Sequence, residues 1–164
     1  MLLSRINRAI PEKVFICVYN SYSTDSLSNG QAVQWDYATD ANGTSVTKPA
    51  AGTKAGGKHM GFSFAGIVAE TIAAGDWGLI QCFGYHSAIR ARTTTGGASN
   101  STPAVAAGVP LTLKSTVFCV ESFAMAIETT STATMYGTWH PCVLALGATS
   151  GFTTATIAGI IRAM

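Results

Sequence analysis

From Val14 to its end, the amino-acid sequence consists of short apolar blocks separated by turns rich in Gly, Ser and Thr. The helical patterns of roughly 10 to 15 residues that alternate with strands in α/β folds do not occur between these blocks. The sequence therefore predicts a mainly β fold, either a compact β-barrel or a β-sandwich. The blocks expected to contain strands are 14–20, 31–38, 62–72, 77–91, 104–130, 142–147 and 154–163.

The length of 164 residues fits one compact domain with a core of its own. We expect residues 1–12 to form an N-terminal arm or short helix and residues 13–164 to form a single β domain. Two segments poor in apolar residues, 38–58 and 93–103, are expected to be long surface loops. Turns are expected at Asn42-Gly43 and Gly56-Gly57.

The N-terminal segment has a helical apolar stripe formed by Leu3, Ile6 and Ile10. Pro11 ends the pattern, and about nine residues are too few for an isolated helix to be stable in water. The apolar side must therefore dock either on its own domain or on a partner. The residues assigned to a partner contact are Leu2, Leu3, Arg5, Ile6, Arg8 and Ile10.

The composition indicates a subunit of an assembly. Charged residues make up 11% of the chain, against about 25% in an ordinary soluble domain, whereas hydrophobic residues make up 48%. A free monomer with so few charges would expose apolar surface of the kind that marks interaction sites. The alternative is a monomer with a neutral surface rich in Thr and Ser.

Nucleic acid and membrane are not expected partners. The formal net charge is only +2, and the basic pair Arg90 and Arg92 fits one solvated face of a strand. The apolar run 14–18 is much shorter than the ~20 residues of a membrane span, and it lacks a signal-peptide pattern. The uncharged stretch 129–161 is interrupted throughout by Thr, Ser, Gly and Pro. We therefore expect synthesis and assembly in a cytoplasm.

The sequence predicts neither a disulfide framework nor a metal site. The four cysteines are widely spaced and form no C-x-x-C pair, so they are expected to be reduced, buried apolar side chains; disulfides of a secreted chain are the alternative. The pairs His140 with Cys142 and Cys82 with His86 share strand faces, but two ligands do not make a site, and the second pair is about 13 Å apart. The cysteines are Cys17, Cys82, Cys119 and Cys142.

No catalytic or cofactor-binding residue is predicted. The segment 52–58 matches G-x-x-x-x-G-K, but His59 replaces the Ser or Thr that binds Mg²⁺ in a phosphate-binding loop, and a strand-like block follows where a helix is needed. Glu70 and Asp76 flank a turn and fit turn residues better than an acid and base. No G-x-S-x-G motif occurs. We expect a protein that is not an enzyme; a small β-sandwich hydrolase is the least favoured alternative.

Several segments carry a family resemblance. GQAVQWDYATDANGTSVTKPA, FAGIVAETIAAGDWGLIQCFGYHSAIRA, AVAAGVPLTL and the final GATSGFTTATIAGIIRAM resemble small virion proteins of tailed bacteriophages, of the capsid decoration or cement type. The resemblance covers residues 28–113 and 141–164 and leaves 114–140 unmatched. It carries over no catalytic residue.

The resemblance implies a compact β domain on the exterior of the phage capsid, present in the host cytoplasm during assembly. The implied partners are the major capsid protein and further copies of the chain, as a homo-oligomer or as neighbours on the shell. A head-fibre, tail or receptor-binding module of the virion is the alternative function.

Overall fold

The computed structural model describes residues 12–49, 63–92, 104–113, 117–122, 142–150 and 154–163. The regular elements of this part of the chain are all β-strands, which confirms the predicted mainly β fold. The arm predicted for residues 1–12 lies outside the described residues except for Glu12. The strands are β1 (Val14–Asn20), β2 (Ala32–Trp35), β3 (Ser45–Thr47), β4 (Phe64–Val68), β5 (Trp77–Arg92), β6 (Ala104–Val105), β7 (Pro110–Leu113), β8 (Val120–Ser122), β9 (Val143–Ala145), β10 (Thr149–Ser150) and β11 (Thr154–Arg162).

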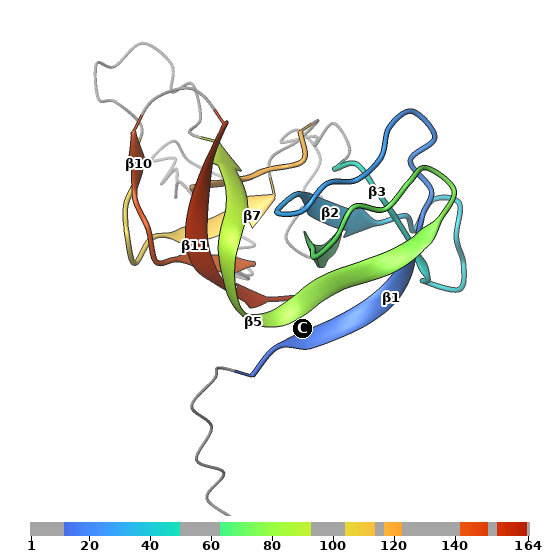
Figure 1. Ribbon diagram of the computed structural model, residues 1–164, viewed down its shortest axis with the longest axis horizontal. Helices are drawn as coiled ribbons and strands as arrows, with labels where there is room; N and C mark the ends of the chain where they lie inside the picture. The colour runs from blue at the N-terminus through green and yellow to red at the C-terminus, as the bar shows by residue number, and fades with distance from the viewer. Residues whose placement is uncertain are drawn as a thin grey trace, which may run out of the picture.

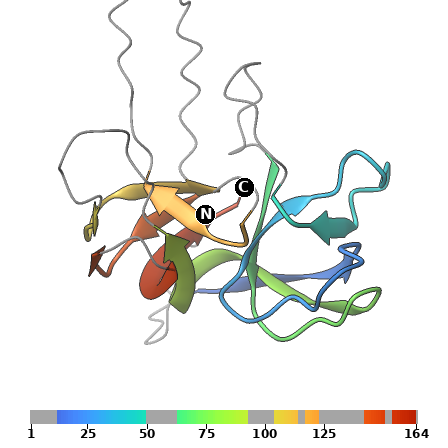
Figure 2. The same cartoon turned by 90° about the horizontal axis from the view of Figure 1, so that it is seen from above.

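The strands form two closed rings of five that share β5 (Figure 1). The first ring runs β1-β3-β2-β4-β5 and closes where β5 pairs with β1. The second runs β5-β11-β9-β7-β8 and closes through the pair Ala91 and Val120. In Figure 2 the blue-to-cyan strands of the first ring and the gold-to-red strands of the second lie on opposite sides of the molecule. Of the two predicted architectures, a β-barrel and a β-sandwich, the structure shows the barrel, with strands closed into two rings.

Strand β5 can serve both rings because it is long and irregular. Its first half pairs with β1 and β4, and its second half pairs with β11 and β8. Against β1 the register shifts between Val14 and Phe15, and against β11 it shifts between Ile157 and Gly159. Such bulges bend a strand and increase its twist, as closing a small ring requires.

Each ring has its own apolar core. Buried side chains of the first ring include Val18, Val33, Val46 and Ile80. The core of the second ring also takes in residues of β2 and β4, so these two strands are buried on both faces. The residues from β2 and β4 in the second core are Ala32, Phe64 and Ile67; those of the second ring include Ile89, Leu111, Leu113, Val143, Ile157 and Ile161.

Both ends of the described chain lie against the middle of β5. A Cβ atom added to Gly84, where φ is +96°, would lie 2.0 Å from the carbonyl oxygen of Glu12. Close to this point, the amide of Ala163 donates a hydrogen bond of 2.9 Å to the carbonyl of Cys82. Glycine is needed at position 84 because the entering chain crosses directly over the strand.

Two sequence-based expectations need correction. The predicted loop 38–58 is interrupted by β3, which buries Val46 and pairs with β1 and β2. Cys17, expected to be buried, is exposed, whereas the other three cysteines are buried. None of the four, all of which lie in the described residues, is part of a disulfide. The turn predicted at Asn42-Gly43 is confirmed, with Gly43 at φ +67°. Residues 93–103 and the turn at Gly56-Gly57 lie outside the described residues.

Candidate protein interface

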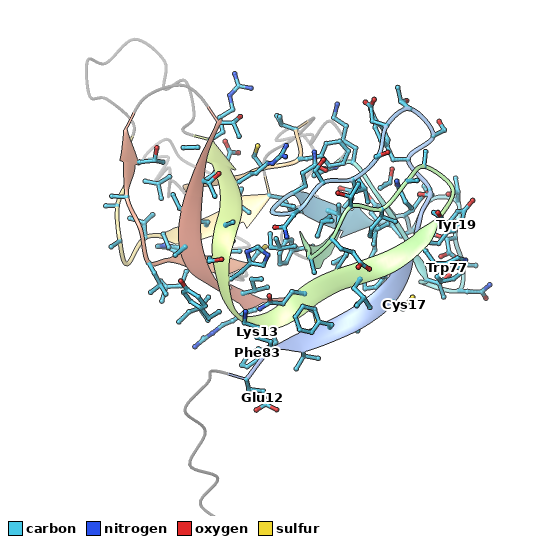
Figure 3. All side chains as sticks on the ribbon, in the orientation of Figure 1. Glu12, Lys13, Cys17, Tyr19, Trp77 and Phe83 are labelled. Atoms are coloured by element: carbon cyan, nitrogen blue, oxygen red, sulfur yellow. The ribbon has the colours of Figure 1, made fainter. Side chains whose placement is uncertain are left out.

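An exposed apolar strip runs along the outer face of the paired strands β1 and β5. Cys17 lies opposite Leu79, and Tyr19 lies opposite Trp77 with the two ring centroids 5.6 Å apart. Trp77 is 57% exposed, which is high for a tryptophan. The labelled side chains in Figure 3 follow one edge of the molecule along these two strands. We define the apolar strip as Phe15, Cys17, Tyr19, Trp77, Leu79 and Phe83.

In the strip, apolar side chains occupy outward-facing positions that are usually polar in an antiparallel sheet. Strands with one solvated face normally alternate apolar and polar residues. In β1 the buried Val18 is flanked by the outward-facing Cys17 and Tyr19, so apolar or weakly polar side chains occupy both faces. In β5 the outward-facing Trp77 and Leu79 alternate with the buried Gly78 and Ile80. Adjacent exposed apolar side chains of this kind mark a surface that another protein segment covers.

Charged groups lie at the ends of the strip and, at the amide of Leu79, along one side of it, where Glu70 is bound. Glu12 and Lys13 precede Phe15, and Asp76 precedes Trp77. The Lys13 ammonium lies 5.9 Å from the ring centroid of Tyr85, within the range of a cation–π contact. The carboxylate of Asp76 accepts a bond from the amide of Trp77 at 3.2 Å. The strip is therefore suited to an apolar occupant with polar or charged flanks.

The structure gives Cys82 and His86 separate backbone partners. The Cys82 thiol donates to the carbonyl of Val14 at 3.4 Å, and Nδ1 of His86 accepts from the amide of Ala88 at 3.0 Å. Burial raises the pKa of Cys82; burial, and secondly the charge of Lys13, lowers the pKa of His86. A protonated thiol and a neutral imidazole, each bonded to the backbone, fit structural roles.

The remaining candidate groups are used in local structure or lie outside the described residues. The carboxylate of Glu70 accepts a bond from the amide of Leu79 at 2.9 Å. Burial raises the pKa of Cys142 to about 11. Within the described residues no group of three metal-ligating side chains occurs, and no helix there is long and apolar enough to span a membrane. His140 and the segment 52–58 lie outside the described part. So do the residues predicted to contact a partner, which are Leu2, Leu3, Arg5, Ile6, Arg8 and Ile10.

The strip was not recognised from the sequence, although a signal was present. The blocks VFICVY and WGLIQCF contain almost no polar residues, whereas a half-solvated strand would alternate. A continuous apolar run fits a strand buried on both faces equally well. Only the pairing of β1 with β5 shows that their outer faces adjoin.

Comparison with known proteins identifies one solved structure with a similar fold. The chain matches no known protein family and no curated protein. Its fold resembles that of a phage head-fibre protein. The crystal structure of the head fibre gp8.5 N base of bacteriophage phi29 matches with a TM-score of 0.50 and 8% sequence identity, over 93% of this chain and 96% of that chain. At this identity the likeness shows a shared fold across almost the whole of both chains.

Proposed function

We propose that this chain is a non-enzymatic structural protein of a phage virion that binds the outer surface of the capsid shell and stabilises it. The observation that carries the proposal is the fold shared, over 93% of the chain, with the base of a phage head fibre. The resemblance of the sequence to capsid decoration proteins points to the same part of a virion. The proposed partners are the major capsid protein and neighbouring copies of this chain.

The surface of the molecule supports an assembly role. Only 11% of all residues are charged, against about 25% in an ordinary soluble domain, so the surface carries few charges. The apolar cores of protein interfaces are depleted in charged residues, so a surface of this type suits a broad, weakly charged contact. The carboxylates of Asp36, Asp40, Glu70 and Asp76 bind backbone amides or hydroxyl groups, which favours a structural over a catalytic use.

The proposal is tested by adding the purified protein to mature shells that lack it. Binding should saturate at a fixed ratio to the major capsid protein and should depend only mildly on salt, because few ion pairs are available for screening. Genome release on heating should shift to a higher temperature, because a ligand that binds only the intact shell favours that state. Bovine serum albumin at equal concentration is the control. Absence of saturable binding to shells would overturn the proposal.

A second function, the base of a head fibre, is favoured by the identity of the structural relative. A fibre base has to attach to the shell but does not have to stabilise it. The same titration separates the two functions, since a fibre base would saturate its sites and leave the release temperature unchanged. Electron microscopy of saturated particles would then show the protein at few shell positions and not across the whole surface.

A further inference from the structure

We propose that the N-terminal segment 1–10 of the chain docks on the apolar strip of its own domain. The occupant is inferred from where the described chain begins. Glu12 is fixed against Gly84 in the middle of β5, one residue along from Phe83, at one end of the strip. Residues 1–10 therefore start beside the strip, and so short a tether gives a local concentration in the millimolar range.

The chemistry of the segment matches that of the strip. In a helix, the spacing of Leu3, Ile6 and Ile10 would place them on one apolar stripe, and the strip offers aromatic and aliphatic side chains without a charge between them. An amphipathic helix laid on an apolar surface with its stripe inward is a recurrent mode of recognition. The docked helix would turn Arg5 and Arg8 outward, where they remain available to the partner proposed above.

The length of the N-terminal segment also matches the length of the strip. Leu3 lies nine residues before Glu12, about 13 Å along a helix at 1.5 Å per residue. Cys17 lies five residues after Glu12, about 16 Å along a strand at 3.3 Å per residue. If the chain reverses at Pro11, Ile10 reaches the end of the strip near Phe83 and Leu3 reaches the neighbourhood of Cys17. Docking requires no shell, so it stands or fails separately from the proposed function.

Disulfide trapping in the purified full-length protein tests the docking. Cys17 is the exposed native thiol of the described chain, and the other three cysteines are buried. A Leu3→Cys variant should form a disulfide with Cys17 on mild oxidation, seen as an intramolecular loss of two hydrogens by intact mass. The matched control is Arg5→Cys, which places a thiol at a similar height on the opposite face of the helix. We expect Leu3→Cys to react several-fold faster than Arg5→Cys.

Two outcomes would overturn the proposal. Equal rates for Leu3→Cys and Arg5→Cys would show that the segment is not held by its apolar stripe. Disulfide-linked dimers without the intramolecular product would assign the strip to a second copy of the chain.

Alkylation of the native thiol gives an independent measurement without an added cysteine. Cys17 should react several-fold more slowly in the full chain than in a chain with Leu3→Asp and Ile6→Asp, and Cys17→Ser identifies its signal. Circular dichroism checks that both chains are folded. Equal alkylation rates in the two folded chains would contradict docking.

Discussion

At the residue scale, single side chains hold the turns by binding several backbone groups each. The side-chain nitrogen Nδ2 of the buried Asn20 donates to the backbone carbonyls of Ile72 and Ala73 at 3.2 and 3.1 Å. Its side-chain oxygen Oδ1 accepts from the backbone amide of Tyr22. These bonds join the end of β1 to the turn that precedes β5. Asparagine suits the position because it carries both donors and acceptors.

Asp40 plays the same part in the turn between β2 and β3. Its carboxylate accepts bonds from the amides of Asn42, Thr44 and Ser45 at 2.9, 2.7 and 2.6 Å. The bond from Asn42, aided by those from Ser45 and Thr44, holds the pKa of Asp40 well below its usual range. A folded-state pKa below the unfolded value means that the ionised group stabilises the fold above the unfolded pKa of about 3.9. This contribution is lost as the pH falls from there toward the folded-state pKa.

We therefore expect Asp40→Asn to loosen the β2–β3 turn at neutral pH and to weaken the loss of stability in acid. Hydrogen exchange at the amides of Thr44 and Ser45, with urea unfolding at pH 7 and pH 3, measures both effects. Asp25→Asn, at an exposed aspartate outside this turn, is the control. Equal exchange rates in the Asp40 variant and the unmodified protein would contradict this role.

At the scale of the elements, the close approach of the entering chain to β5 depends on one glycine. Gly84 has a positive φ, and its missing side chain leaves room for the carbonyl of Glu12. Gly108 has a similar φ of +86°, yet a Cβ added there meets nothing within 4 Å. The two positions therefore share the backbone conformation and differ in packing.

Replacing each glycine by alanine separates these two effects. Gly108→Ala should cost about 1 kcal/mol, the penalty of a left-handed conformation for a residue with a side chain. Gly84→Ala adds a clash with fixed backbone and should lower the free energy of unfolding by on the order of 3 kcal/mol or more. Urea unfolding of both variants gives the comparison. Equal costs would mean that the chain at Glu12 can move away freely.

At the scale of the whole molecule, the two rings share the strand β5, and strands β2 and β4 of the first ring also pack into the second core. Ala32, Phe64 and Ile67 of the first ring are part of the core of the second. Neither core can lose its packing without exposing apolar surface of the other ring. This predicts a single cooperative unfolding transition.

A destabilising substitution in the second ring should therefore also lower the unfolding midpoint of the first ring. Leu111→Ala removes a fully buried side chain of the second core and should cost about 3 kcal/mol. Trp35 and Trp77 lie in the first ring, and a Trp139→Phe background leaves them as the fluorescent reporters. The midpoint from tryptophan fluorescence should fall as far as the midpoint from circular dichroism. A fluorescence midpoint unchanged by Leu111→Ala would show that the rings unfold separately.

The sequence predicts the individual long strands far better than their arrangement. The block 14–20 coincides with β1, and the blocks 77–91 and 154–163 each differ from β5 and β11 by a single residue at the C-terminal end, because long apolar runs bounded by turn residues are strong local signals. Strand β3 was not predicted because it has only three residues in a polar segment. With only Val46 buried, these residues show no recognisable alternation of apolar and polar side chains. The sharing of β5 and the outward position of the strip follow from contacts between distant segments, which local patterns do not encode.

The division of β5 between two rings also sets an order of events as the chain emerges from a ribosome. The first ring is complete in sequence once Arg92 has been made, whereas the second waits for the strand that ends at Arg162. During that interval the outer faces of β2 and β4, with Phe64 and Ile67, lack the core that later covers them. A half-made chain would therefore expose apolar surface that is covered only once the last strand has been added, and exposed surface of this kind favours aggregation.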